Sequence, residues 1–210
     1  MLRTLLVARH GETDWNVANR WQGQSDVPLN DNGRAQARSL AVRLRGSIVS
    51  GIVSSDLSRA RETAEILAAA LGLAFDHVDV GLRERSFGCF EGLTRDECMA
   101  RYPNEWLAWQ RDHLMPVGGE TAEALLARAT SAFERAARHV ARDDAPGLVV
   151  THGAVIRAIV AGATGERPPP IQNAELWRMV WDERIITAHV IRDADSQPRP
   201  RTLQGEEPPV

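Results

Sequence analysis

Short apolar runs alternate along this chain with segments of helical periodicity, and this alternation limits the folds that it can adopt. Residues 4–8, 48–53 and 148–151 are mostly apolar runs, typical of strands buried on both faces. Between them, apolar residues recur at the spacing of an amphipathic helix. The predicted helices cover residues 31–45, 57–71, 120–142 and 154–162. This order predicts an α/β fold, a three-layer α/β/α sandwich around a mostly parallel sheet.

The remaining regular segments predict an antiparallel edge for that sheet. Residues 174–182 and 185–191 alternate in the manner of two strands and are interpreted as a terminal hairpin. A further strand is expected over residues 74–80, near an edge. Residues 14–30 are rich in polar and turn-forming residues and are expected to form a loop.

The chain is expected to form a single domain over residues 1–192. Its 210 residues fit one large domain, and no repeat or shift in composition divides them. Residues 81–119 are irregular, with short helices predicted at 94–101 and 103–111, and are interpreted as a cap-like insertion over the active site. Residues 193–210 contain several prolines and are expected to be a C-terminal tail.

Charge and composition exclude several classes of protein. The net charge of −3 provides no basic field for nucleic acid, although all 25 basic residues are arginine. No apolar run approaches the roughly 18 residues that span a membrane, and the run at residues 4–8 is too short for a signal peptide. Two cysteines are too few for a disulfide framework. We therefore expect a cytoplasmic protein that binds neither nucleic acid nor membrane.

Polar side chains follow each predicted strand. In chain order they are Arg9 and His10, Arg59, Glu84, and His152. Parallel sheets bind ligands at the carboxyl ends of their strands, so we expect these side chains to meet. The helix N-termini expected at residues 57 and 153 would present free N–H groups at the same edge, and helix N-termini bind anions. The sequence therefore predicts a phosphate pocket.

These residue types also suggest a mechanism for phosphoryl transfer. A neutral His10 imidazole is a competent nucleophile. Arg9, Arg59 and a protonated His152 would hold the phosphate oxygens. Glu84 would supply the proton that the leaving group needs. Arginine and histidine carry the required charge, and the carboxylates are too scattered to form a Mg²⁺ site, so no metal is expected.

At these residues the chain resembles the histidine phosphatase superfamily, whose fold is phosphoglycerate mutase-like. The ordered segments that carry the resemblance include 6–13 (LVARHGET), 20–23 (RWQG), 54–57 (SSDL), 82–84 (LRE), 118–121 (GGET) and 150–153 (VTHG). The resemblance covers about residues 3–190. Dedicated mutases carry a longer insertion between the Glu84 region and the last histidine, and this chain lacks it. In this respect the chain resembles the monofunctional phosphatases.

The resemblance implies a role for each matching residue. His10 matches the residue that becomes phosphohistidine, and Glu84 matches the proton donor. Arg9, Arg59 and His152 match residues that bind the phosphate. Four further residues are expected to bind substrate: Asn16, Gln22, Gly23 and Gly153. The family pattern implies no cofactor, and a small phosphorylated metabolite as substrate.

Several alternatives stay open at this point. The same pocket would serve a cofactor-dependent phosphoglycerate mutase, or a module that binds phosphorylated ligands without turnover. Glu84 has a plainer interpretation as an ion-pair partner of Arg83 or Arg85, two residues expected to be surface charges. The alternating tryptophans of the 174–182 strand are expected to be exposed, which would permit a homodimer through the edge or the face of the hairpin.

Overall fold

The computed structural model describes residues 2–75, 77–142, 144–182 and 184–191. Its sheet has the strand order β2-β3-β1-β4-β5. The strands are β1 (Arg3–Arg9), β2 (Ile52–Ser54), β3 (Gly147–Thr151), β4 (Leu176–Asp182) and β5 (Arg184–Ile191). The first three are parallel, whereas β4 runs antiparallel to β1 and β5 antiparallel to β4. The mostly parallel sheet with an antiparallel edge is confirmed.

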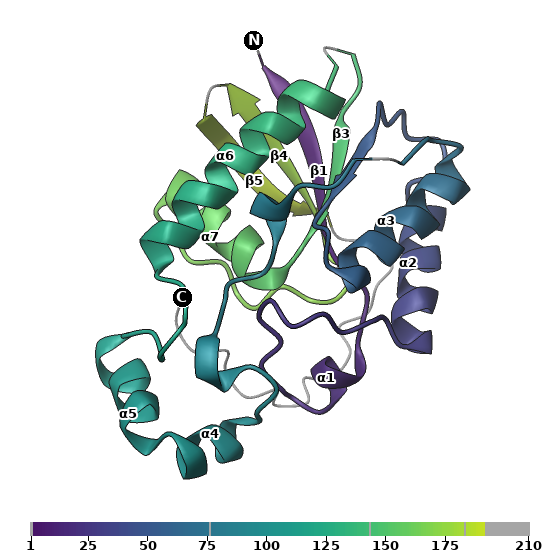
Figure 1. Cartoon of the computed structure of the whole chain (residues 1–210). Coiled ribbons are helices and arrows are strands. Elements are labelled where there is room, and N and C mark those ends of the chain that lie inside the picture. The colour runs from purple at the N-terminus through teal and green to yellow at the C-terminus, as the bar shows by residue number, and fades with distance from the viewer. Residues whose placement is uncertain (1, 76, 143, 183, 192–210) are drawn as a thin grey trace.

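Helices cover both faces of this sheet (Figure 1). Helices α2 (Asp31–Arg43) and α3 (Ser58–Leu71) pack on one face, and α6 (Ala122–Val140) and α7 (Gly153–Thr164) on the other. The other helical elements are α1 (Asp14–Val17), α4 (Arg95–Arg101), α5 (Pro103–Asp112) and the 3₁₀ turns η1 (Val80–Leu82) and η2 (Gly88–Phe90). Strand β1 shows how the layers arise. Leu5 and Val7 point into the core shared with α6 and α7, and Leu6 and Ala8 point into the core shared with α2 and α3. The three-layer sandwich is therefore confirmed.

Two strand predictions need correction. Val78 makes only an isolated bridge with Ser54, so residues 74–80 do not form the expected strand. The reason is local, because the Asp79 carboxylate accepts a hydrogen bond from Gly81 N and starts η1 instead. The second strand begins at Ile52 rather than at residue 48, since Ser50 bonds through its backbone N–H to Pro146 O.

The segment between α3 and α6 forms a small core of its own. Helices α4 and α5 occur where they were predicted, and Figure 1 shows them beyond the end of the sheet. Phe90, Trp106 and Trp109 are buried together there. The interpretation of residues 81–119 as a cap stays a prediction, and the tail expected at 193–210 lies outside the described residues.

The tryptophans of the terminal hairpin are buried, contrary to the expectation that they are exposed. Trp177 and Trp181 are 6% and 5% exposed and belong to the core beneath α6 and α7. They alternate because one face of β4 packs on that core. Surface tryptophans therefore provide no argument for a homodimer. Within the described ranges, the helices are all too short or too polar to cross a lipid bilayer.

Candidate active site

The two histidines of the predicted pocket lie at the ends of neighbouring strands. Arg9 pairs with Thr151 in the parallel register of β1 and β3, and His10 N donates to Thr151 O at 3.0 Å. His10 and His152, the next residues along each strand, are therefore side by side, with ring centroids 5.1 Å apart and planes at 60°. Both are buried, at 2% and 0% exposure.

The tautomer of His10 follows from its hydrogen bond. His10 Nδ1 lies 2.6 Å from Gly11 O, and a carbonyl oxygen only accepts, so Nδ1 carries the proton. In the neutral ring, Nε2 then keeps its lone pair. The next residue must be glycine, because a Cβ at Gly11 would lie 2.3 Å from Gly33 O at the start of α2.

Burial and nearby cations keep both imidazoles neutral. Burial is the main cause that lowers the pKa of His10 well below its ordinary value, and Arg59 and Arg9 lower it further. Burial, followed by the Arg59 charge, likewise lowers the pKa of His152 well below its ordinary value. The expectation of a protonated His152 is therefore wrong for the protein alone, because sequence spacing does not reveal that this ring is fully buried.

Two guanidinium groups are held in place by backbone carbonyls. Arg59, in the first turn of α3, donates to Gly23 O at 2.8 Å and to Ser25 O at 2.9 Å. Burial lowers its pKa to about 10, which leaves it charged at neutral pH. Arg9 donates to Ile171 O. The carboxylates nearest to Arg59 in sequence, Glu62 and Asp56, bind Arg34 and Arg83 instead.

Glu84 lies beside the first turn of α7. Its carboxylate accepts from Arg85 N at 2.9 Å and from Ala154 N at 3.3 Å, and the residue is 8% exposed. Arg128 of α6 holds this segment by donating to Gly81 O, Arg83 O and Glu84 O. Sequence reasoning missed Arg128, because it lies 44 residues further along the chain than Glu84.

The four expected substrate-binding residues surround the same place. Gly23 supplies the carbonyl that binds Arg59, and Gln22 beside it is buried. A Cβ at Gly153 would lie 3.6 Å from Arg9 Nε. The side-chain oxygen Oδ1 of Asn16 accepts hydrogen bonds from Thr13 N, Thr13 Oγ1 and the side-chain amide of Asn173. Its amide N–H groups are left as the donors available to a ligand.

A carboxylate already binds each of the two expected helix N-termini. At α3, the Asp26 carboxylate accepts from Ser58 N at 2.7 Å, and N-cap Leu57 makes no side-chain cap bond. At α7, the Glu84 carboxylate accepts from Ala154 N at 3.3 Å, and N-cap His152 makes no side-chain cap bond. Gly153 N, at the start of α7 and beside Arg9, is the N–H that this arrangement leaves to an anion.

Buried polar atoms without a partner gather in this cluster. Buried polar groups are nearly always hydrogen-bonded, and each exception needs an explanation. The atoms concerned are Arg9 Nε, Gln22 Oε1, Arg59 Nε, and His152 Nδ1 and Nε2. A bound oxyanion would satisfy the nitrogen donors among them. Across the described residues, no three His, Cys, Asp or Glu side chains are placed to hold a metal ion.

The structure also corrects the expectation that Arg85 is a surface charge, and it shows that Glu91 supports the loop that binds Arg59. Arg85 is 2% exposed rather than a surface charge; its Nε donates to Glu120 O and its guanidinium lies over Trp109 at 5.4 Å. Glu91 accepts from Gln24 N and Ser25 N, and so supports the loop whose carbonyls hold Arg59.

Comparisons with known proteins agree with this geometry. Phosphoglycerate mutase-like protein 4 of Arabidopsis thaliana is 41% identical over 162 residues, covering 74% of this chain and 68% of its own length. Glucosyl-3-phosphoglycerate phosphatase of Mycobacterium tuberculosis is 39% identical over 166 residues, covering 76% of this chain and 74% of its own. The solved structure of mycobacterial glucosyl-3-phosphoglycerate phosphatase with VO3 has a TM-score of 0.76 and 33% identity, and covers 92% of this chain and 100% of that one.

The family model of the histidine phosphatase superfamily (branch 1) matches residues 5–193, nearly the whole of the described chain. The segments matched include both buried histidines, Arg59 and Glu84. The chain belongs to the histidine phosphatase superfamily, a group of phosphoric monoester hydrolases.

Proposed function

We propose that this chain hydrolyses phosphate monoesters of small metabolites through a phosphohistidine on His10, without a metal. The observation that carries the proposal is the arrangement around that ring. Nδ1 is bound to Gly11 O, which leaves Nε2 as a nucleophile, and His152 and Arg59 lie beside it with unpartnered buried nitrogens. A neutral imidazole with the Arg59 and Arg9 cations beside it is suited to attack a phosphate dianion.

The reaction takes place in two balanced steps. The lone pair of His10 Nε2 forms a bond to phosphorus while the bond from phosphorus to the ester oxygen breaks, and the Glu84 carboxylic acid protonates that oxygen. Water then attacks phosphorus, Glu84 takes its proton, and the bond from phosphorus to nitrogen breaks to release inorganic phosphate. Arg9 and Arg59 hold the equatorial oxygens throughout.

The remaining pocket residues position the phosphate. Further donors come from His152, from the backbone N–H of Gly153 at the start of α7, and from the side-chain amide of Asn16. Gln22 and Gly23 form the wall next to Arg59. The similar structures of mycobacterial glucosyl-3-phosphoglycerate phosphatase with VO3 and with inorganic phosphate support an oxyanion site of this kind.

Trapping the intermediate tests the proposal. Rapid mixing with ³²P-labelled p-nitrophenyl phosphate is expected to give label on the protein that is stable to alkali and labile to acid, as for a phosphoramidate. His10→Gln is expected to abolish both the label and turnover. His113→Gln, a change at an exposed histidine, serves as the matched control and is expected to keep both. Label retained on the His10 variant would refute the assignment.

The products separate hydrolysis from the mutase alternative. With 3-phosphoglycerate, a phosphatase releases inorganic phosphate whether or not 2,3-bisphosphoglycerate is present. A mutase instead isomerises the substrate and depends on that bisphosphate. We expect release of phosphate, and a substrate screen ranked by kcat/KM would identify the metabolite. A module that only binds phosphorylated ligands would do neither.

A further inference from the structure

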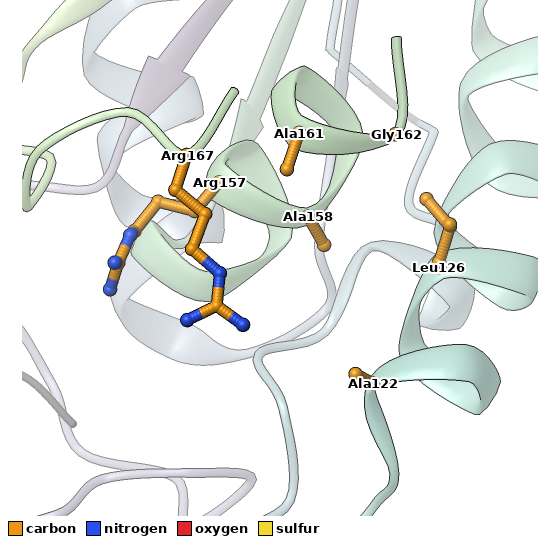
Figure 2. Close-up of a pocket in the computed structure, with 7 residues that line it drawn as sticks. All are labelled: Ala122, Leu126, Arg157, Ala158, Ala161, Gly162 and Arg167. Atoms are coloured by element: carbon orange, nitrogen blue, oxygen red, sulfur yellow. The ribbon is translucent and has the colours of Figure 1, made fainter. Parts of the chain in front are cut away.

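A second pocket, of about 150 Å³, lies between α6 and α7 and contains none of the catalytic side chains proposed above. Figure 2 shows its two kinds of wall. Arg157 and Arg167 lie together on one side, and the other side is apolar. The apolar wall is made of Ala122, Leu126, Ala158 and Ala161.

The charge of this pocket is positive. Across the described part of the chain, no carboxylate is paired with Arg167, which is exposed. Two acids lie at the start of α6: Glu120 is bound to Arg128 at 2.6 Å, and Glu123 in the first turn is exposed and does not line the pocket. Ala122 is the first residue of the 19-residue helix α6, so the positive end of a long helix borders the same space. Two guanidinium groups and a helix N-terminus attract an anion.

We propose that the α6–α7 pocket binds a small organic anion, with its carboxylate or phosphate on Arg157 and Arg167 and its apolar body on Leu126 and the alanines. A cavity of about this volume holds a body the size of a benzene ring. The charged and apolar walls together select an amphipathic anion over inorganic phosphate or a neutral hydrocarbon. Arg157 is 8% exposed, which favours a ligand head with delocalised charge.

Such an anion could come from two sources, because the pocket lies on α7, the helix whose first turn borders the active site. Ala154 N, which the Glu84 carboxylate contacts, lies one helical turn before Ala158, a rise of roughly 5.4 Å. The anion is therefore either the leaving-group part of the substrate or a separate metabolite bound beside the active site. Only the first of these rests on the proposed function.

Calorimetric titration of the full chain with benzoate and with benzamide, its neutral analogue, tests the site without turnover. We expect benzoate to bind at least about fivefold more tightly than benzamide, because only its head is charged. Arg167→Gln is expected to remove that difference, and Ala161→Leu to remove binding of both by filling the pocket. The matched controls Arg38→Gln and Ala127→Leu, at exposed helix positions, are expected to behave as the parent.

The outcomes separate the site from the reaction. The proposed anion site is refuted if benzoate does not bind, or if its affinity is unchanged in both Arg167→Gln and Ala161→Leu. This conclusion does not depend on the catalytic activity. If saturating inorganic phosphate weakens benzoate binding, the anion is the leaving-group part of a substrate; if it leaves the affinity unchanged, the anion is a separate metabolite. Loss of phosphohistidine trapping with benzoate binding intact would refute only the proposed hydrolysis.

Discussion

At the scale of single residues, the site depends on which form of each ionisable group the fold stabilises. His10 is neutral because burial and the Arg59 charge lower its pKa, and its hydrogen bond to Gly11 O determines which nitrogen is free. Arg59 remains charged despite burial, held by carbonyl oxygens rather than by a carboxylate. A counter-ion there would compete with phosphate, so carbonyl partners keep the full positive charge available to a ligand.

The role of Glu84 as proton donor predicts a dependence on the leaving group. Glu84→Gln removes the proton that an alkoxide needs, whereas p-nitrophenolate leaves without one. We expect kcat/KM to fall about 10²- to 10⁴-fold for an alkyl phosphate and far less for p-nitrophenyl phosphate. Steady-state kinetics on the two substrates would measure this. Equal losses on both would assign Glu84 a purely structural role.

At the scale of elements, loops and helix ends from distant parts of the chain hold the site together. The loop 22–25 carries the carbonyls that bind Arg59, and Glu91 in the next segment accepts from Gln24 N, Ser25 N and Ser25 Oγ. Asp26 in turn caps α3, the helix that carries Arg59. The position of one guanidinium therefore depends on two further segments, residues 22–26 and the turn that carries Glu91, neither adjacent to α3 in sequence.

This support predicts an effect of Glu91→Gln on phosphate binding. The amide nitrogen faces backbone donors that the carboxylate had satisfied, and the unmet hydrogen bonds cost about 1–3 kcal/mol of the free energy of unfolding. The loop shifts and Arg59 is less well placed. We expect a raised KM and weaker binding of inorganic phosphate, measured by calorimetry alongside denaturant unfolding. Glu65→Gln, in an exposed pair with Arg61, is the control expected to leave phosphate affinity unchanged. Unchanged phosphate affinity in the Glu91 variant would show that the loop does not need this anchor.

At the scale of the whole molecule, folding brings cations together and removes them from water. Two arginines, Arg9 and Arg59, and two neutral histidines are gathered at one end of the sheet. Burying these polar groups is unfavourable, and favourable packing in other parts of the protein offsets it. The two core layers on either side of the sheet, built around α6 with α7 and α2 with α3, provide that packing. The cost of the site should therefore appear in the pH dependence of unfolding.

Both site histidines have a folded-state pKa below that of the unfolded chain, so the unfolded state binds more protons as the pH falls below about 6.5. Stability is fully present above that pH and decreases below it. From pH 7.5 to 5.5 the two residues together are expected to cost up to ~3 kcal/mol in the free energy of unfolding. Denaturant unfolding at several pH values measures this. A double variant, His10→Asn with His152→Asn, should flatten the slope and His113→Asn should not; an unchanged slope in the double variant would contradict the buried neutral state.

The sequence alone determined the sandwich and the order of its strands and helices, because both follow from apolar periodicity, which is a local property. It also predicted that His10, His152, Arg59 and Glu84 meet at one end of the sheet, since these follow strands or begin helices. Tertiary structure decided what depends on packing: the neutral state of His152, the burial of Arg85, and the missing strand near Val78. The anchors Arg128 and Glu91 likewise act on backbone groups far away in sequence, and only the folded chain brings them there.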